Sequence, residues 1–274
     1  MTRLLQQSSG FIAHGVRMSF LALALAWPSP TNAMTDASKI FSDPQVIELA
    51  NAAQHGDTDL VKKLIQAGAN THAVGKSGMT VTHFALLAPR PQAPQTLDVL
   101  LNAGADPVSR RTDGETVPRI AVSRNDADPA VVSVLFNHGI GANWRPSQPP
   151  YDQKSLLDSA ISGHNPAVVT LLLQHGADID YVDPFAGSAL HGALGSIQFD
   201  IAAQLVDAGI DLSLQNNTSP KIKNPLVVRQ TALEYFCKFD AGKRGANPLP
   251  EVAAGWARLQ AALARRGTTM PCAL

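Results

Sequence analysis

The chain has 274 residues, of which 45% are hydrophobic and 5% aromatic, and its formal net charge at pH 7 is zero. This composition supplies ample apolar material for a folded core. It disfavours nucleic-acid binding, because no basic stripe is present to follow a phosphate backbone.

The first 33 residues differ from the rest of the chain. Arg3 and Arg17 precede a short apolar run at residues 18–27, and the sequence PSPTNA then supplies prolines and small residues up to Ala33. This order predicts a secretory signal peptide cleaved after Ala33, followed by a short linker at residues 34–43. The apolar run is about half of the ~20 residues needed to cross a bilayer. An uncleaved anchor or a buried helix is the alternative. We expect a periplasmic protein with no membrane segment after cleavage.

A turn of the type GAD recurs at the end of short apolar helices. Its glycines are Gly68, Gly104, Gly139, Gly176 and Gly209, spaced by 36, 35, 37 and 33 residues. Paired apolar residues four positions apart precede each glycine, and this spacing predicts an amphipathic helix of about ten residues that the glycine ends with a positive φ. A period of about 35 residues predicts an all-α solenoid, which buries its core between neighbouring units.

A second helix opens with Thr or Ser before each of these helices, in TVTHFAL, TVPRIAV, SLLDSAI, SALHGAL and TALEYFC. A hydroxyl at such a start accepts the free amide hydrogens of the first turn. SALHGAL and LLLQHGADID resemble the ankyrin repeat family, as does LANAAQHGDTDLVKKLIQAGAN. The resemblance implies an ankyrin-repeat domain over residues 44–274, with about six helix-turn-helix units and degenerate terminal caps. The expected units are residues 44–76, 77–112, 113–150, 151–184, 185–228 and 229–270.

Three units depart from this pattern. The segments APRPQAP and RNDADP lengthen the second and third units between their helices, and DAGKRGANPLPEVAA lengthens the sixth. Arg258, Arg265 and Arg266 fit a terminal cap that faces water. Both cysteines, Cys237 and Cys272, fall in this last unit. In an oxidising compartment they can form a disulfide between the first helix of the cap and the tail. Two unpaired thiols are the alternative.

No catalytic signature is found in the sequence. It contains no GxSxG elbow, P-loop, HExxH or CxxC motif. His83 and His191 occupy the ankyrin histidine position, where the imidazole bonds to backbone in the adjoining turn. Asp106, Asp178 and Asp211 repeat as turn residues that can bond their own backbone. We therefore expect no enzyme activity, no catalytic residue, no metal site and no cofactor.

Loop tips between units are where an ankyrin-like stack places its specificity. Aromatic and arginine side chains dominate interface energetics, because they bury large areas at small entropic cost. The predicted partner-binding residues are Arg110, Arg111, Trp144, Arg145, Tyr151, Tyr181 and Phe185. The alternative is that Tyr151, Tyr181 and Phe185 only pack the loops onto one another.

The expected function is stoichiometric binding of another protein by a chain that is monomeric when free. Exported bacterial ankyrin proteins, which this chain resembles, include immunity proteins that neutralise toxins delivered by a secretion system, often lipases. A bacterial toxin or lipase effector is thus the expected partner. Two alternatives stay open. One is a periplasmic stress-protective protein assisting a catalase-type enzyme, and the other is a secreted effector directed at a host.

Overall fold

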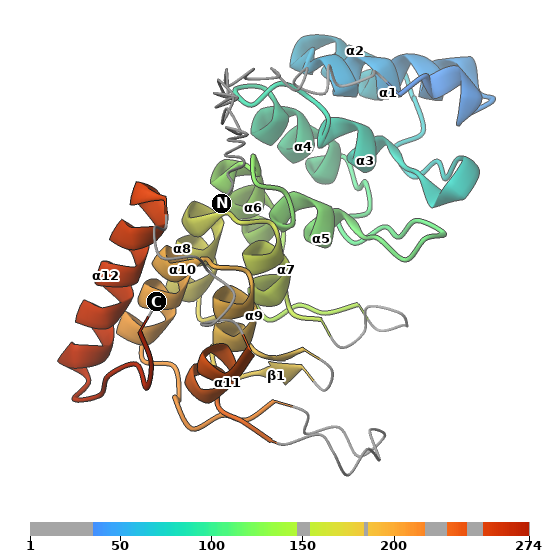
Figure 1. The fold of residues 1–274 in the computed structure, drawn as a ribbon. Helices are drawn as coiled ribbons and strands as arrows, with labels where there is room; N and C mark the ends of the chain where they lie inside the picture. The colour runs from blue at the N-terminus through green and yellow to red at the C-terminus, as the bar shows by residue number, and fades with distance from the viewer. Residues whose placement is uncertain (1–34, 147–153, 184–185, 217–228, 240–248, 274) are drawn as a thin grey trace, which may run out of the picture. The chain divides into compact units, whose positions relative to one another are not determined.

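The computed structural model describes residues 35–146, 154–183, 186–216, 229–239 and 249–273. The chain divides into two compact units, residues 1–35 and 36–274, and every helix described belongs to the second. Within that unit, antiparallel helix pairs follow one another along the chain (Figure 1). The prediction of an all-α repeat fold is confirmed.

Each repeat contains a first and a second helix. The first helices are α1 (Pro44–His55), α3 (Val81–Ala85), α5 (Val117–Val122), α7 (Leu156–Ser162), α9 (Ala189–Gly195) and α11 (Ala232–Phe239). The second helices are α2 (Thr58–Gln66), α4 (Ala93–Asn102), α6 (Pro129–Asn137), α8 (Pro166–Gln174), α10 (Phe199–Asp207) and α12 (Pro250–Arg265). Short 3-10 helices, η1 (Ala37–Lys39) and η2 (Lys76–Gly78), precede α1 and α3, and strands β1 (Val182–Asp183) and β2 (Gly187–Ser188) form one antiparallel hairpin.

The recurring glycines end the second helices as the sequence predicts. Gly68 has a φ of 90° and Gly209 a φ of 98°, values that a residue with a Cβ rarely adopts. The helix-to-helix turns of the fourth and fifth units also need a positive φ, but there the chain uses His164 and Ile197 at 57° and 62°. These two positions carry backbone strain that Gly56, at 71° in the first unit, avoids.

Reciprocal hydrogen bonds fix the start of most first helices. The third helical residue accepts a bond from the backbone N–H of the capping Thr or Ser, through His83 Nδ1, Asp158 Oδ2, His191 Nδ1 and Glu234 Oε2. Among the first helices that begin with Thr or Ser, α5 is the exception. Its third residue is Arg119, which has no acceptor, and the buried hydroxyl of Thr116 has no hydrogen-bond partner among the described residues. The sequence prediction that each hydroxyl caps its helix is therefore wrong at Thr116.

The long connections in the second and third units follow from their inserted residues. Residues 86–92 join α3 to α4 and residues 123–128 join α5 to α6, whereas residues 163–165 suffice between α7 and α8. The two long connections contact each other, because Arg90 Nη2 donates to the backbone oxygen of Asp126 at 2.5 Å. Arg124 also binds the Asp126 carboxylate at 2.7 Å and lowers its pKa. The insertions thus form a joint contact between neighbouring units.

The core consists of two clusters of buried side chains. One runs from Ala37 to Ile140 and the other from Val122 to Leu263, so they meet at α5 and α6. The half-buried side chain of Trp144 packs against both clusters. Two residues of the expected linker, Ala37 and Phe41, are buried in the first cluster, and the Phe41 ring lies 5.7 Å from that of Phe84.

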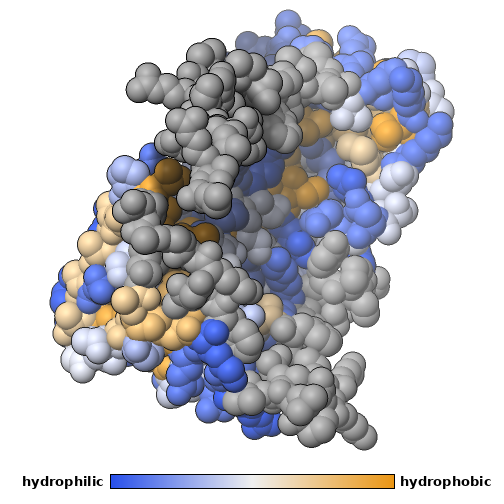
Figure 2. Space-filling model, in the orientation of Figure 1, coloured by the Kyte–Doolittle hydropathy of each residue, from blue (hydrophilic) through white to orange (hydrophobic). Residues whose placement is uncertain are grey.

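Helix α12 closes the stack through arginine contacts to α10. Arg258 Nε lies 2.5 Å from Asp200 Oδ1, and Arg265 Nη2 lies 2.7 Å from both carboxylate oxygens of Asp207. Arg266 donates to the backbone oxygen of Ile210. These arginines are exposed, as expected for a terminal cap, and all three also bind the preceding unit. The face of α12 turned to water is alanine-rich, and Figure 2 shows it in pale orange; its exposed alanines are Ala253, Ala254, Ala257, Ala261 and Ala264.

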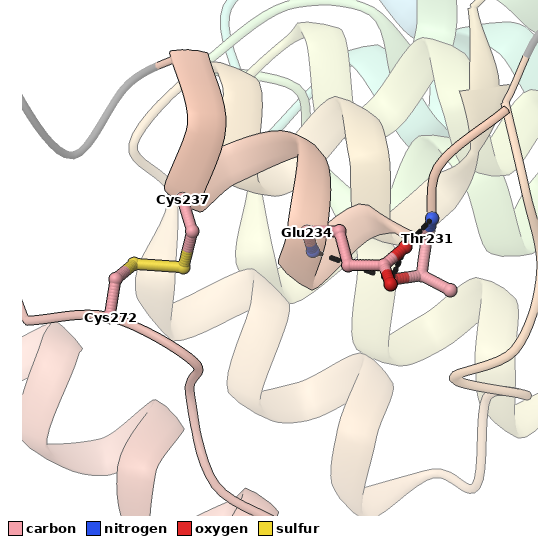
Figure 3. The surroundings of a disulfide bond; sticks show 4 residues. All are labelled: Thr231, Glu234, Cys237 and Cys272. Carbon is pink, nitrogen blue, oxygen red and sulfur yellow. Dashed lines mark hydrogen bonds between the residues drawn. A yellow bond between two sulfur atoms is a disulfide. The ribbon is translucent and has the colours of Figure 1, made fainter. Parts of the chain in front are cut away.

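The structure joins Cys237 of α11 to Cys272 of the tail in a disulfide, with the two Cα atoms 5.6 Å apart (Figure 3). The same figure shows the start of α11, where the Glu234 carboxylate accepts from the backbone N–H of Thr231 at 2.9 Å. The first helix of the last unit is thus held by a cap at its start and by a covalent bond near its end.

Candidate protein-binding surface

Among the described residues, hairpins precede four of the first helices and lie along one side of the repeat domain (Figure 1). Backbone bridges join Val74 to Thr80, Arg110 to Thr116 and Gln215 to Thr231, and β1 pairs with β2 between Val182 and Ser188. Each of these hairpins ends at the residue before the first helix of its unit. We call these four hairpins, with the exposed sides of α5, α7 and α9, the hairpin surface.

Arg110 and Arg111 lie together on the second hairpin. The Arg111 backbone N–H donates to the oxygen of Glu115 at 2.8 Å, and its guanidinium lies 2.5 Å from the Asp113 carboxylate. Gly114 makes the tight turn with a φ of 88°. Both arginines are partly exposed, so this hairpin presents cationic side chains at a defined position.

A cavity of about 310 Å³ separates the first hairpin from the second. The buried hydroxyls of Thr71, Thr80 and Ser109 line it, and His72 and Arg110 stand beside them. Thr80 Oγ1 and Ser109 Oγ lie 2.9 Å apart, so the hydroxyls hold one another in place. Such a lining suits a polar side chain of a partner.

Contacts within the fold already involve the side chains of Trp144, Arg145 and Tyr181. The Arg145 guanidinium lies 3.6 Å from the centre of the Tyr181 ring, and its Nη2 lies 3.8 Å from the Asp178 carboxylate. The Asp178 carboxylate thus pairs with the preceding unit, whereas the carboxylates of Asp106 and Asp211 accept from backbone N–H groups of their own turns. The structure thus brings Arg145 and Tyr181 together and places Trp144 between the core clusters. Tyr151 and Phe185 lie outside the described residues.

A group of charged residues from two neighbouring units was missed by sequence reasoning. Arg119 Nη2 lies 3.4 Å from Glu115 Oε1, and Lys154 Nζ donates to Ser162 Oγ at 3.0 Å. Burial raises the pKa of Asp158, and burial together with Arg119 lowers the pKa of Lys154. One signal for this group is present in the sequence, since Arg119 stands at the position that His83 and His191 occupy in their own units.

The exposed side of α9 carries only very small residues. Gly192, Gly195 and Ser196 are exposed there, and neither glycine has a positive φ. A Cβ added at Gly192 would meet only Ile161 Cγ2 at 3.7 Å, and one added at Gly195 would meet nothing within 4 Å. Packing within the chain therefore does not require these glycines, although glycine weakens a helix. Their absence of side chains leaves room for an outside surface to approach α9.

The two ankyrin-position histidines are held by backbone contacts. His191 Nε2 lies 3.1 Å from the oxygen of Gln230, as predicted, whereas His83 Nε2 has no partner among the described residues. Burial lowers the pKa of both, that of His83 to about 4. Neutral, buried imidazoles that accept a capping bond serve the fold. Within the described ranges, no three His, Cys, Asp or Glu side chains gather where they could hold a metal ion, and none of the helices there is long and apolar enough to span a bilayer.

Comparisons with known proteins point to one repeat type. The family model described as "Ankyrin repeat" matches residues 152–184. The B-cell lymphoma 3 protein homolog of Mus musculus is 30% identical over 196 residues, which cover 70% of this chain and 42% of the mouse protein. The chain therefore spans less than half the length of that relative. The crystal structure of the ankyrin repeat domain of Bcl-3, titled a unique member of the IkappaB protein family, aligns with a TM-score of 0.55 and 28% identity over 68% of this chain and 75% of that one.

Proposed function

Because this chain is an ankyrin-repeat protein, we propose that it works without catalysis, as a scaffold that binds another protein through the hairpin surface. The observation that carries this proposal is the set of side chains and spaces on that surface. Arginines on the second hairpin, a hydroxyl-lined cavity between the first two hairpins and the glycine face of α9 all belong to it. The likeness to Bcl-3 rests on the repeat itself, so it supports a scaffold and not a particular partner.

We further propose that the partner is a toxin, such as a lipase effector, and that the protein is an exported immunity protein of a bacterial periplasm. The signal-peptide pattern of residues 1–33 supports export. The pairing of Cys237 with Cys272 supports an oxidising compartment, because such bonds persist there. In this role the hairpin surface would cover the active site of the toxin.

The test of the scaffold role is co-purification of the tagged full chain with the product of the adjacent reading frame. Two variants then locate the interface. Arg111→Glu should weaken the complex by reversing a charge on the second hairpin. Gly192→Leu should weaken it by filling the space over α9, while thermal unfolding stays near the wild-type temperature. The matched control is Lys63→Glu on α2, the same charge reversal at an exposed residue outside the hairpin surface. Full affinity in both interface variants would exclude the hairpin surface.

The finer role is tested in cells. Expression of the toxin should kill cells that lack this protein, and survival of those cells would contradict the immunity role. Peroxide sensitivity of a deletion strain, without sensitivity to sibling cells, would instead favour the stress-protective alternative. Detection of the protein in host cytosol would favour the host-directed effector.

A further inference from the structure

A second cavity lies one helix length from the hairpin surface. Helix α9 begins at the end of the β1–β2 hairpin and ends at Gly195, and the cavity of about 230 Å³ opens at the following turn. It is lined by that turn, by the first turn of α10 and by the first two turns of α12, and also by His164 and Pro166 at the start of α8. It therefore belongs to the other end of the helix pair from the hairpins.

One side chain that lines this cavity has polar atoms without a hydrogen-bond partner among the described residues. Gln198 is only 8% exposed, and neither its Oε1 nor its Nε2 has a hydrogen-bond partner among the described residues. Asn165, at the same position in the preceding unit, accepts from the Val168 N–H at 3.1 Å and donates to the Ala127 oxygen at 2.8 Å. Gln198 does neither, and α10 has no side-chain cap. A buried polar group without partners costs stability, so it calls for an explanation outside the packing.

The walls of the cavity are apolar, and its ionisable lining residues are Asp200, Glu251 and the exposed His164. Ile197, 41% exposed, and the half-buried Val252 face it. Asp200 is held by Arg258 at 2.5 Å, whereas the exposed Glu251 has no ion-pair partner in the described part of the chain. The volume lies below the ~300 Å³ at which small-molecule sites begin and above the ~150 Å³ that holds one benzene ring. The space therefore suits one large apolar side chain with a cation beside it.

We propose that this cavity binds a short basic peptide segment of a partner protein. One apolar side chain enters between Ile197 and Val252, and a basic residue beside it pairs with Glu251. The carboxamide of Gln198 carries a donor and an acceptor side by side, which match the C=O and N–H that a peptide backbone presents. Its terminal torsion is soft, so the group can turn toward the peptide at little cost. A partner seated on the hairpin surface could reach this site only with a second segment.

The test uses the full chain, labelled with ¹⁵N, and the synthetic peptide acetyl-Gly-Lys-Leu-Lys-Gly-amide. We expect saturable amide shifts confined to residues 196–201 and 251–255. Replacing the peptide's leucine with glycine should abolish them. Gln198→Leu should raise the dissociation constant at least about fivefold, the effect of losing about 1 kcal/mol. Glu251→Lys should weaken binding as well, while Glu48→Lys, the same charge change on α1, should not.

Thermal unfolding separates binding from folding. Gln198→Leu replaces a buried, unpartnered carboxamide with an apolar side chain of similar size, so its unfolding temperature should equal or exceed that of the wild type. If that variant does not fold, the affinities of Glu251→Lys and Glu48→Lys for the peptide test the proposal instead. Unchanged affinity in Gln198→Leu or Glu251→Lys, or shifts centred on the hairpins, would overturn the proposal. Capture of a partner by the hairpin surface would be unaffected by either outcome.

Discussion

At the residue scale, His83 makes the stability of the fold depend on pH. Its Nδ1 accepts from the Thr80 backbone N–H at 3.2 Å, and burial lowers its pKa from 6.5 to about 4. Between these two values the unfolded chain binds a proton on this imidazole and the folded chain does not. The contribution of His83 to the free energy of unfolding is therefore fully present above pH 6.5, and it is lost as the pH falls toward 4.

We predict that this histidine contributes roughly 2 kcal/mol of the stability lost between pH 7 and pH 5. His83→Gln keeps an acceptor near Thr80 without a titrating ring, so its free energy of unfolding should change less over this range. Guanidinium chloride unfolding of both proteins at the two pH values measures the difference. Equal losses in the wild type and the variant would contradict this role.

Trp144 offers a second prediction at this scale. Because its side chain packs against both core clusters, Trp144→Ala should lower the free energy of unfolding by about 2 to 3 kcal/mol. Tyr181→Ala is the comparison. That ring's stacking with Arg145 is worth about 1 kcal/mol or less at a partly exposed site. If denaturant unfolds both variants at the same concentration, Trp144 is not a packing residue and is available to a partner.

At the scale of elements, α11 and α12 depend on one another through the tail. The disulfide closes a loop with a sequence separation of 35 residues, and a loop of this length restricts the unfolded chain by about 3 to 4 kcal/mol in the chain-entropy estimate. The exposed pairs that Arg258 and Arg265 form with α10 add little, because solvent screens their charges.

Cys237→Ser combined with Cys272→Ser should therefore loosen the last unit more than any single arginine variant. We expect faster amide hydrogen exchange in α11 and α12, with α7 and α8 almost unchanged. Asp207→Asn, which weakens only the Arg265 pair, is the control and should show a much smaller effect. The same exchange rates in oxidised wild type and the double variant would show that the disulfide does not stabilise this unit.

Most helix starts and ends could be predicted from the sequence, because each of them has a local cause. The glycine turns and the Thr or Ser starts are set by backbone conformation within a few residues. What could not be predicted depends on distant partners. The arginines of α12 look like solvent-facing residues until the fold brings Asp200 and Asp207 beside them. Likewise, Trp144 looks like a loop-tip aromatic in the sequence, and only the stacking of units places it between two core clusters.

At the scale of the whole repeat domain, the two core clusters give the stack two partly independent halves. Stacked repeats contact mainly their neighbours, so damage in one half need not spread. Leu97→Ala, at a fully buried position of the first cluster, should cost about 2 to 5 kcal/mol. Amide exchange should accelerate across α1 to α4 and change little in α9 to α12. The same acceleration in every helix would show instead that the domain unfolds as one unit.

The position of Trp144 at this boundary also makes the protein its own optical probe. A second indole, Trp256, is buried against Phe199 and Phe236, with ring centres 5.0 and 5.6 Å away, under the last unit. The chain has three tryptophans, so Trp27→Phe leaves one emitter at the junction of the halves and one at the closing end. Removing either in turn lets intrinsic fluorescence follow the two places separately, without any attached dye.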